Sequence, residues 1–297
     1  MFQLTIRKTM IISLAVILLV FTGLLSIMVN QELKNLKTLK QIAEISNIIA
    51  TFNKGTIELS LERSLTQVSL NLDPPILPQI KDMLDSQREK SDALFAETRA
   101  LLEDSKNIED KESLMRAFHD NLREMENLRN MADRQMALPL VSRTVREVKN
   151  LPEEIKAVVL DLNGISVWLN GMMDDAPKDV GALNSIISNA WTVREYGGRE
   201  RTLYAIATAR GEPIKRMDLA YMFQNHGKVI QAENAIEFLA ASVDLGPEVN
   251  ESIEKVKTTY FSQYNNLRET LIRESVTGEY SVDFQTLFTE SEEALQT

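Results

Sequence analysis

Apolar residues recur at helical spacing along almost all of the chain beyond residue 30, and few residues interrupt the pattern. Only 11 of the 297 residues are glycine and only 8 are proline. Sheets and their turns use both residues freely, whereas helix interiors exclude them. The chain is therefore predicted to be all-α, with long helices joined by few connections.

The expected connections are short and sharply marked. The residue before a proline avoids the helical region, so Pro74 is expected to end the first long helix. Leu151-Pro152, followed by two glutamates, is typical of a helix start. The other breaks are polar or Gly-Pro turns at residues 105–110, 174–178, 211–213 and 245–247. The helices between breaks span roughly 20–40 residues, a length typical of bundles.

An uncharged segment stands near the start of the chain, from Thr9 to Val29. A helix needs about 20 apolar residues to cross a bilayer. A cleaved signal peptide would have a shorter apolar region and a cleavage site with small residues. The segment therefore predicts an uncleaved transmembrane helix at residues 9–29, preceded by a cytoplasmic N-terminus at residues 1–8.

The charges beside this segment do not orient it. Arg7 and Lys8 precede the segment, and Lys34, Lys37 and Lys40 follow it. Lys and Arg near the ends of a span favour the cytoplasmic side, and here the two sides are nearly balanced. The charge pattern alone thus leaves the orientation open.

A short internal repeat divides the remaining chain. The segment ERSLT at residues 62–66 is matched by ERTLY at residues 200–204, an offset of 200 − 62 = 138 residues. A long helix, a turn and a further helix follow each copy. A chance match is the alternative, but the repeat predicts two related modules in a sensor domain at 30–297. The modules are placed at roughly 30–150 and 151–297.

Several classes of function are excluded or disfavoured by composition and motifs. The net charge of −10 argues against a nucleic-acid partner. The chain has no cysteine, so disulfides, thiolate metal sites and cysteine catalysis are impossible. Motifs for phosphate binding, zinc proteolysis and serine hydrolysis are missing. Neither histidine has ligand partners at helical spacing, and the adjacent acids Asp174 and Asp175 are typical of a solvated helix end. We therefore predict no enzyme activity, no cofactor and no metal.

Arg63 lies on a helix that is apolar on two sides. At about 100° per residue, one apolar stripe lies opposite a second stripe, and Arg63 falls beside the second. A helix that is apolar on two faces is packed on two faces, so Arg63 is expected to be partly buried beside an anion or a carboxylate. The first stripe is Ile57, Leu61, Leu65, Val68 and Leu72, and the second is Leu59 and Leu70.

Two arginines of the second repeat share this character. Arg199 falls on an apolar stripe, and Arg201, the counterpart of Arg63, falls on a face of small residues. A guanidinium offers paired donors that match nitrate, carboxylate and phosphate. Internal salt bridges with nearby glutamates are the alternative. We predict a small-anion pocket formed by Arg63, Arg199 and Arg201, with Tyr196 and Tyr204 as hydroxyl donors.

At these residues the sequence resembles the nitrate- and nitrite-sensing (NIT) domain family. The resemblance rests on LERSLTQVSL at residues 61–70 and REYGGRERTLYAIATARGEP at residues 194–213. The architecture also resembles the helical bimodular sensors of methyl-accepting chemotaxis receptors. The family's arginine pattern carries over to Arg63, Arg199 and Arg201, whereas Ser64 stands where the family has glycine.

The resemblance implies a fold, a ligand and a signalling route. The fold is two stacked antiparallel four-helix bundles, and the ligand is a small anion such as nitrate, nitrite or a small carboxylate. Signals would pass through a second membrane span to a cytoplasmic module beyond the given chain. A parallel homodimer is also expected, because bundles with residual apolar stripes commonly pair about a two-fold axis.

Together these features predict the extracytoplasmic sensing region of a bacterial transmembrane receptor of the chemotaxis type. The anchor, the missing cysteines and the resemblance place it at the inner membrane, with most of the chain in the periplasm. Two alternatives stay open: the sensor of a histidine kinase or cyclase, and a membrane-anchored helical scaffold for a protein partner.

Overall fold

The structure, a computed structural model, describes residues 6–73, 78–173 and 177–296 and the side chains from residue 21 to 295 within those ranges. Every regular element in these ranges is a helix. The predicted helical bundle is therefore confirmed. The breaks expected at Pro74 and at residues 174–176 fall outside the described residues.

The chain divides into two compact units. The first, Met1–Ser46, contains the N-terminal part of helix α1 (Ile6–Leu70). The second, Asn47–Thr297, contains the rest of α1 and all later helices. Each unit is described by itself below.

The predicted transmembrane helix at residues 9–29 is contradicted. Among the described residues, no helix has both the length and the apolar character needed to cross a membrane. The side chains of residues 9–20 lie outside the described part. The fold class with a membrane helix and the inner-membrane location are both corrected by this finding.

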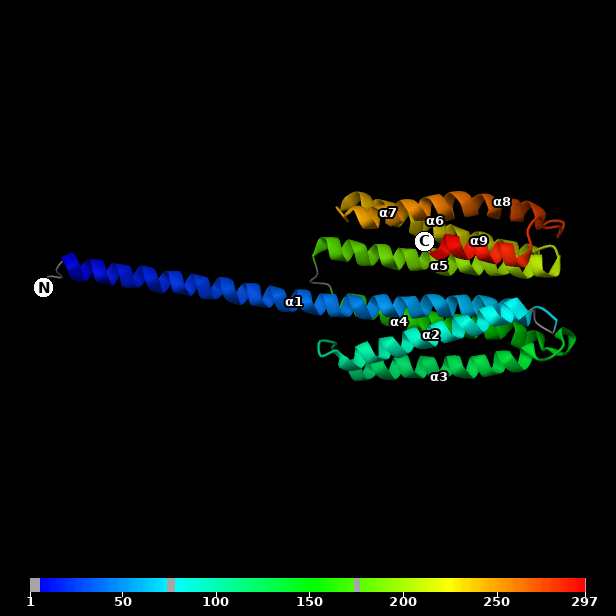
Figure 1. The fold of residues 1–297 in the computed structure, drawn as a ribbon, viewed down its shortest axis with the longest axis horizontal. Coiled ribbons are helices and arrows are strands. Elements are labelled where there is room, and N and C mark those ends of the chain that lie inside the picture. The colour runs from blue at the N-terminus through cyan, green and yellow to red at the C-terminus, as the bar shows by residue number, and fades with distance from the viewer. Residues whose placement is uncertain (1–5, 74–77, 174–176, 297) are drawn as a thin grey trace. The chain divides into compact units, whose positions relative to one another are not determined.

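The first bundle of the second unit consists of four helices. They are residues 47–70 of α1, α2 (Pro78–Asp104), α3 (Lys111–Met136) and α4 (Val145–Gly171), with a short 3₁₀ turn η1 (Leu140–Ser142) before α4 (Figure 1). Phe52, Phe95 and Phe118 come from three of these helices, and their ring centroids lie 5.7–6.1 Å apart. These buried rings form the centre of the bundle core.

The second bundle follows the same plan. Its helices are α5 (Lys178–Arg210), α6 (Arg216–Ser242), a third helix formed by α7 (Pro247–Val256), the π-helix η2 (Lys257–Tyr264) and α8 (Asn265–Glu274), and lastly α9 (Phe284–Gln296). Tyr260 and Tyr264 of the π-helical segment pack into the core with Val229 and Leu295. A π-helix is rare, and its wider turn changes which side chains face the core.

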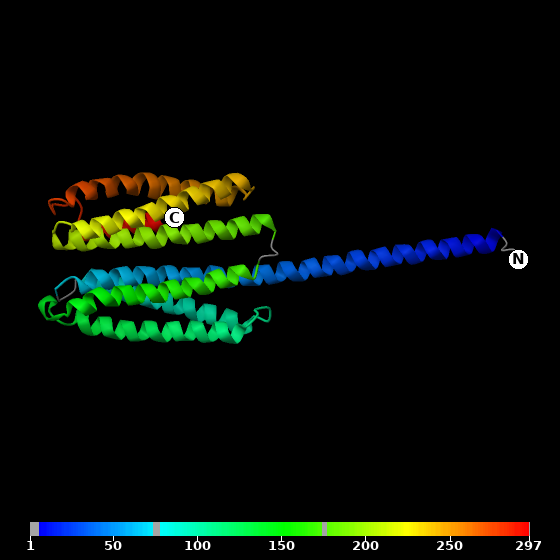
Figure 2. The same cartoon turned by 180° about the vertical axis from the view of Figure 1, so that it is seen from behind.

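Helices α1 and α5 lie side by side, one from each bundle, in the views of Figures 1 and 2. Arg63 of α1 donates a hydrogen bond to Glu195 of α5 across this contact. We call the contact between residues 47–70 and α5 the α1–α5 seam. Arg63 is 3% exposed, so the burial expected from its two-sided helix is confirmed.

Local signals account for the end of α5 and the start of α4. Gly211 ends α5 in the left-handed conformation (φ 60°), and the Glu212 amide donates to the Ala207 carbonyl, as in a Schellman motif. The helix start expected at Leu151 is wrong, because α4 begins at Val145. Its amide donors are capped earlier, where the Thr144 hydroxyl accepts from the Glu147 amide at 3.1 Å. Residues 150 and 151, where we placed the module boundary, lie within α4.

The three phenylalanines packed edge to face in the first bundle predict a large stability difference between buried and exposed positions. Phe118→Ala should lower the free energy of unfolding by about 3–5 kcal/mol, because it leaves a cavity between two rings. Phe238→Ala on α6 is the matched control: this ring is 72% exposed, and its loss should change stability by roughly 0.5 kcal/mol or less. Urea denaturation measures both, and equal effects would contradict the core described above.

Candidate functional site

An arginine-rich cluster occupies the α1–α5 seam, and one half of it is centred on Glu195. This glutamate is fully buried on α5 and accepts from Arg63 of α1. It also accepts from Arg199, one turn further along α5, at 2.7 Å. The Arg199 guanidinium stacks on the Tyr196 ring, 4.5 Å from its centroid. One carboxylate thus holds two arginines.

The other half of the cluster is centred on Glu292 of α9. Arg194 of α5 donates to this carboxylate at 2.7 Å and to the Leu295 carbonyl at 2.5 Å. Arg201 donates to the second oxygen of Glu292 at 2.5 Å and lies over the Phe288 ring. The Arg201 Nε is buried and makes no hydrogen bond within the described residues. This half of the cluster links α5 to the last helix.

A cavity of about 10 Å³ lies between the two halves. This is about the space of one water molecule. Three arginines and one carboxylate reach it from α1, α5 and α9, namely Arg63, Arg194, Arg201 and Glu292. Ser60, Ser64 and Gly198 complete its polar lining. The cavity therefore has guanidinium groups on several sides.

Positive charge exceeds negative charge at this place. In the described part of the chain, four guanidinium groups pair with two carboxylates, those of Glu195 and Glu292. Burial raises the pKa of Glu58, the other acid near Arg194, and so disfavours its negative form. Burial also lowers the pKa of Arg194, although Glu292 opposes this effect. An additional anion would stabilise such a cluster.

The structure brings together only part of the predicted pocket. Arg63 and Arg201 line the cavity, whereas Arg199, Tyr196 and Tyr204 do not. The Tyr196 ring lies between Arg199 and Lys228. Tyr204 is fully buried, and its hydroxyl donates to Glu200 over 3.5 Å. The two tyrosines therefore serve the packing of α5 and do not reach the cavity.

Arg194 also lines the cavity, although it is not among the residues predicted from the sequence. Its signal was present in the helical spacing, because Arg194, Gly198 and Arg201 stand at i, i+4 and i+7 and share one face of α5. Arg199 stands about 140° from Arg194 around the helix at 100° per residue and points elsewhere. A search for one continuous face, instead of repeat counterparts, would have favoured Arg194 over Arg199.

The first repeat glutamate, Glu62, holds its own bundle together. It is fully buried on α1 and accepts from Arg129 of α3 at both oxygens, at 2.8 and 2.7 Å. Arg88 of α2 adds a third bond at 3.2 Å and pairs in turn with Asp133. A buried carboxylate costs free energy unless cations compensate it, and two guanidinium groups do so here.

Glu200 occupies the equivalent position in the second bundle. It accepts from Arg268 of α8 at 2.5 Å, and His226 of α6 lies 3.6 Å from its other oxygen. The spacing of the partners along the chain is also nearly the same. His226 follows Glu200 by 26 residues, and Arg88 follows Glu62 by 26 residues. Arg268 follows Glu200 by 68 residues, and Arg129 follows Glu62 by 67 residues. The repeat is thus a shared arrangement of a buried glutamate with two basic side chains beside it. In the second bundle one of them is a histidine.

Neither a metal centre nor a known relative helps to define the site. Within the described ranges, no three His, Asp or Glu side chains gather as a group that would hold a metal ion. No family model, no curated protein and no solved structure matches the chain. The resemblance to the NIT family therefore remains a prediction.

The ion pairs of Glu195 with Arg63 and Arg199 predict a loss of stability in acid. Burial raises the pKa of Glu195, but Arg63 and Arg199 lower it further, to about 2 from its ordinary 4.5. Because the folded state holds the charged form, this stabilisation is complete above about pH 4.5 and is lost as the pH falls toward 2. Glu195→Gln should remove that part of the pH dependence. Denaturation measurements from pH 6 to 2 test this prediction. Glu103→Gln is the control, because Glu103 forms an exposed ion pair with Arg99. The same pH dependence of stability in both variants would contradict the prediction.

Proposed function

We propose that the chain is a sensing module that binds a small oxyanion at the α1–α5 seam. The observation that carries the proposal is the excess of buried guanidinium groups over carboxylates around the small cavity. Guanidinium groups are always charged in proteins, so such an excess costs free energy until an anion compensates it. The resemblance to nitrate- and nitrite-sensing domains supports the same conclusion.

The size and donors of the cavity select the ligand class. Arg63, Arg194 and Arg201 offer planar paired donors, and two serines add hydroxyl groups. Nitrate, nitrite and small carboxylates such as acetate match the planar geometry of this donor set. The cavity holds about one water, so a bound oxyanion takes the place of the Glu292 carboxylate, the lining acid that comes from α9.

Displacing Glu292 connects binding to a movement. This carboxylate joins α9 to two arginines of α5. When an anion takes over those arginines, the attachment of α9 to α5 weakens, and the helices shift between two packed arrangements. The sensor then reports the anion through the position of α9. The output module that receives this signal stays a prediction.

A structural scaffold is the second candidate. Each predicted arginine already has an internal carboxylate partner, Glu195 or Glu292. On this alternative the cluster only stabilises the contact between the bundles, and anions bind weakly at any exposed arginine. A homodimer fits either candidate, because Leu33, Leu36 and Leu39 of the first unit are half or more exposed.

Calorimetry with nitrate, nitrite and acetate tests the proposal. At least one anion should bind with a dissociation constant in the micromolar range, about 8 kcal/mol. Arg201→Ala should abolish binding while helicity is retained, and Arg201→Lys should weaken it by roughly tenfold, because a point charge lacks the planar fork. Arg123→Ala, at an exposed arginine of α3, is the matched control and should bind as the native protein does.

Glu292→Gln separates the two candidates by the sign of its effect. If Glu292 competes with the anion, the neutral variant should bind roughly tenfold more tightly, and added anion should restore its stability. If the cluster is only structural, the variant should be less stable and indifferent to the three anions. The second outcome would replace the sensing module with the scaffold.

A further inference from the structure

Glu200 and His226 of the second bundle face each other at a distance just too long for a hydrogen bond. The Nδ1 atom of His226, on α6, lies 3.6 Å from the Oε2 atom of Glu200, on α5. Both atoms are buried, and neither has a hydrogen-bond partner among the described residues. An N–H···O hydrogen bond in proteins spans about 2.7–3.2 Å. A small approach of α6 to α5 would therefore complete this one.

The first bundle closes the same gap with an arginine. Arg129 donates to both oxygens of Glu62, at 2.8 and 2.7 Å, and Arg88 adds a third bond. Arg88 has the place that His226 has in the second bundle, 26 residues after the glutamate. A guanidinium group stays charged in proteins, whereas an imidazole changes its charge between about pH 5 and 8. The second bundle thus holds a titratable side chain where the first holds a permanent cation.

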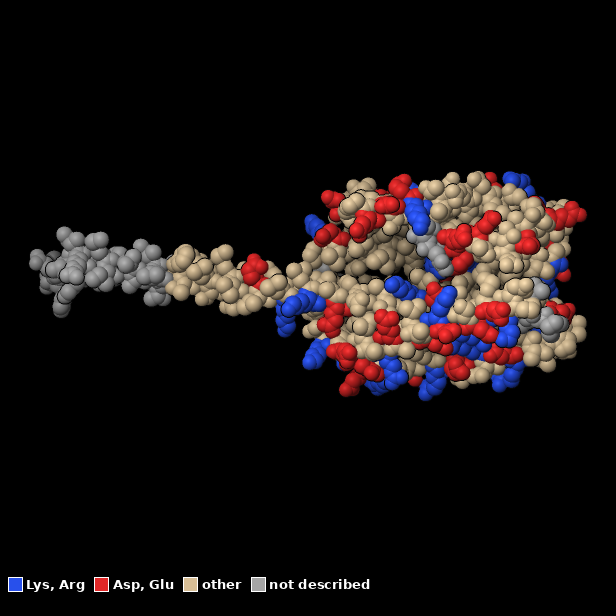
Figure 3. All heavy atoms as spheres, in the orientation of Figure 1, with Lys and Arg blue, Asp and Glu red and all other residues tan. Residues whose placement is uncertain are grey.

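Burial distinguishes this pair from the charges on the surface of the second unit. Acidic and basic side chains are scattered together over the face of the unit that Figure 3 shows. Water and salt screen such charges, so each pair contributes little to stability. Glu200 is buried, whereas the His226 side chain is 23% exposed. The imidazole therefore has a buried nitrogen beside a carboxylate and an edge at which it exchanges protons with water.

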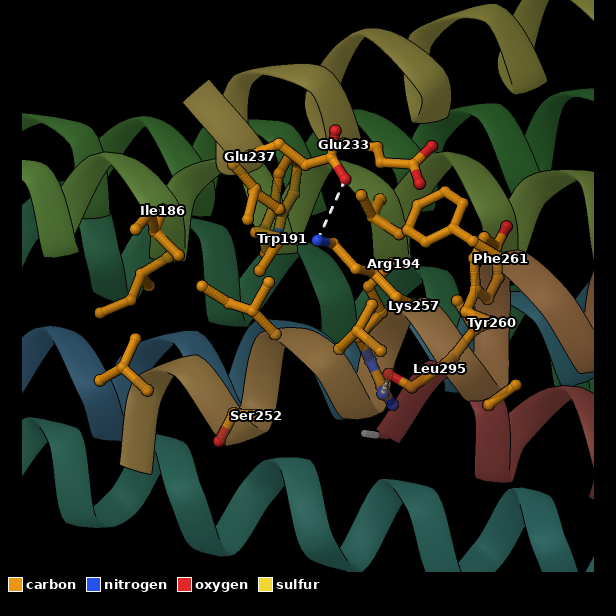
Figure 4. Close-up of a pocket in the computed structure, with 18 of the residues that line it drawn as sticks. Ile186, Trp191, Arg194, Glu233, Glu237, Ser252, Lys257, Tyr260, Phe261 and Leu295 are labelled. Carbon is orange, nitrogen blue, oxygen red and sulfur yellow. Dashed lines mark hydrogen bonds and ion pairs between the residues drawn. The ribbon is translucent and has the colours of Figure 1, made fainter. Parts of the chain in front are cut away.

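Helices α5, α6, α8 and η2 bring charged or titratable groups close to the pair. Arg268 of α8 donates to the other oxygen of Glu200 at 2.5 Å. Glu233 of α6 lies on the wall of a neighbouring cavity (Figure 4), where burial raises its pKa while Lys257 and His226 oppose this effect. The remaining groups are tyrosines whose pKa is raised by burial, so that they stay neutral: Tyr204, Tyr260 and Tyr264. Arg268 is thus the cation already bound to Glu200, and His226 is the side chain placed to supply a second.

We propose that His226 and Glu200 form a proton-binding site, and that its occupancy in acid tightens the packing of α6 on α5. A protonated imidazole has N–H groups on both nitrogens, so Nδ1 donates to the Oε2 atom of Glu200. The pair is then closed as Arg88 closes the Glu62 cluster. A neutral imidazole has one N–H group and no charge. At higher pH the buried oxygen therefore lacks a charged donor, and α6 is held less tightly.

This proton site is distinct from the proposed anion site. Its side chains come from α5, α6 and α8, whereas the small cavity at the seam is lined from α1, α5 and α9. Glu200 stands between Arg199 and Arg201 on α5, so a change in the packing of this turn reaches the arginine cluster. Proton binding itself needs no oxyanion, and it is measured in chloride alone.

The pH dependence of stability tests the proposal, because the chain has two histidines. The folded state alone offers Glu200 to the imidazole. The stabilisation is therefore present below the ordinary histidine pKa of about 6.5 and is lost as the pH rises above it. The unfolding equilibrium constant should increase roughly tenfold between about pH 5.5 and 8, and His226→Gln should remove this increase. His119→Gln, at an exposed histidine of α3, is the matched control and should keep it.

His226→Arg separates proton binding from a merely structural histidine. This variant gives the second bundle the residue type found in the first, so it should fold, remain stable at both pH values and lack the increase. Nuclear magnetic resonance of the native protein adds a direct measurement: the His226 ring and the Glu200 backbone amide should titrate together with one midpoint. Three results would overturn the proposal: equal pH dependence in the native protein and His226→Gln, an unchanged increase in His226→Arg, or a Glu200 amide that does not follow the His226 ring.

Discussion

Each bundle of the second unit is organised by a glutamate buried on its central helix. Glu62 of α1 and Glu200 of α5 are both buried, and each lies beside basic side chains from two other helices of its bundle. A buried carboxylate without such partners would destabilise the fold by several kcal/mol. The apolar positions determine which faces of the helices are buried. The glutamates determine which helices are in contact and which turns of those helices lie next to each other.

The residue that follows each of these glutamates is an arginine whose side chain forms an ion pair with another helix. Arg63 crosses the seam to α5, whereas Arg201 reaches α9. The Glu-Arg pair thus performs two tasks: the acid holds one bundle together, and the arginine builds the cluster at the seam. With Arg194 and Arg199 this cluster carries more positive charge than its two carboxylates compensate. The excess is the physical basis of the proposed anion sensing.

Local patterns in the sequence predicted much of this structure. Scarce glycine and proline predicted long helices, and Gly211 and Pro247 stand at the turns where they were expected. The repeat predicted the equivalence of Glu62 and Glu200, and two apolar stripes predicted the burial of Arg63. In each case, neighbours within one helix carry the information.

Contacts between distant residues could not be predicted in the same way. Arg63 and Glu195 lie 132 residues apart, and periodicity gives the face of a helix without naming the helix opposite. For the same reason Arg199 was preferred to Arg194, and the role of Glu292 on a short last helix was not foreseen. The uncharged run near the start also suggested a membrane helix, whereas no described helix fits one.

The central claim is that the arginine cluster is held for an anion. Its most direct test is the free energy of unfolding measured at constant ionic strength while chloride is replaced by nitrate, nitrite or acetate. The account predicts that one of these anions stabilises the protein by about 1.4 kcal/mol for each tenfold rise in concentration above its dissociation constant. Equal stability in all four anions would contradict it.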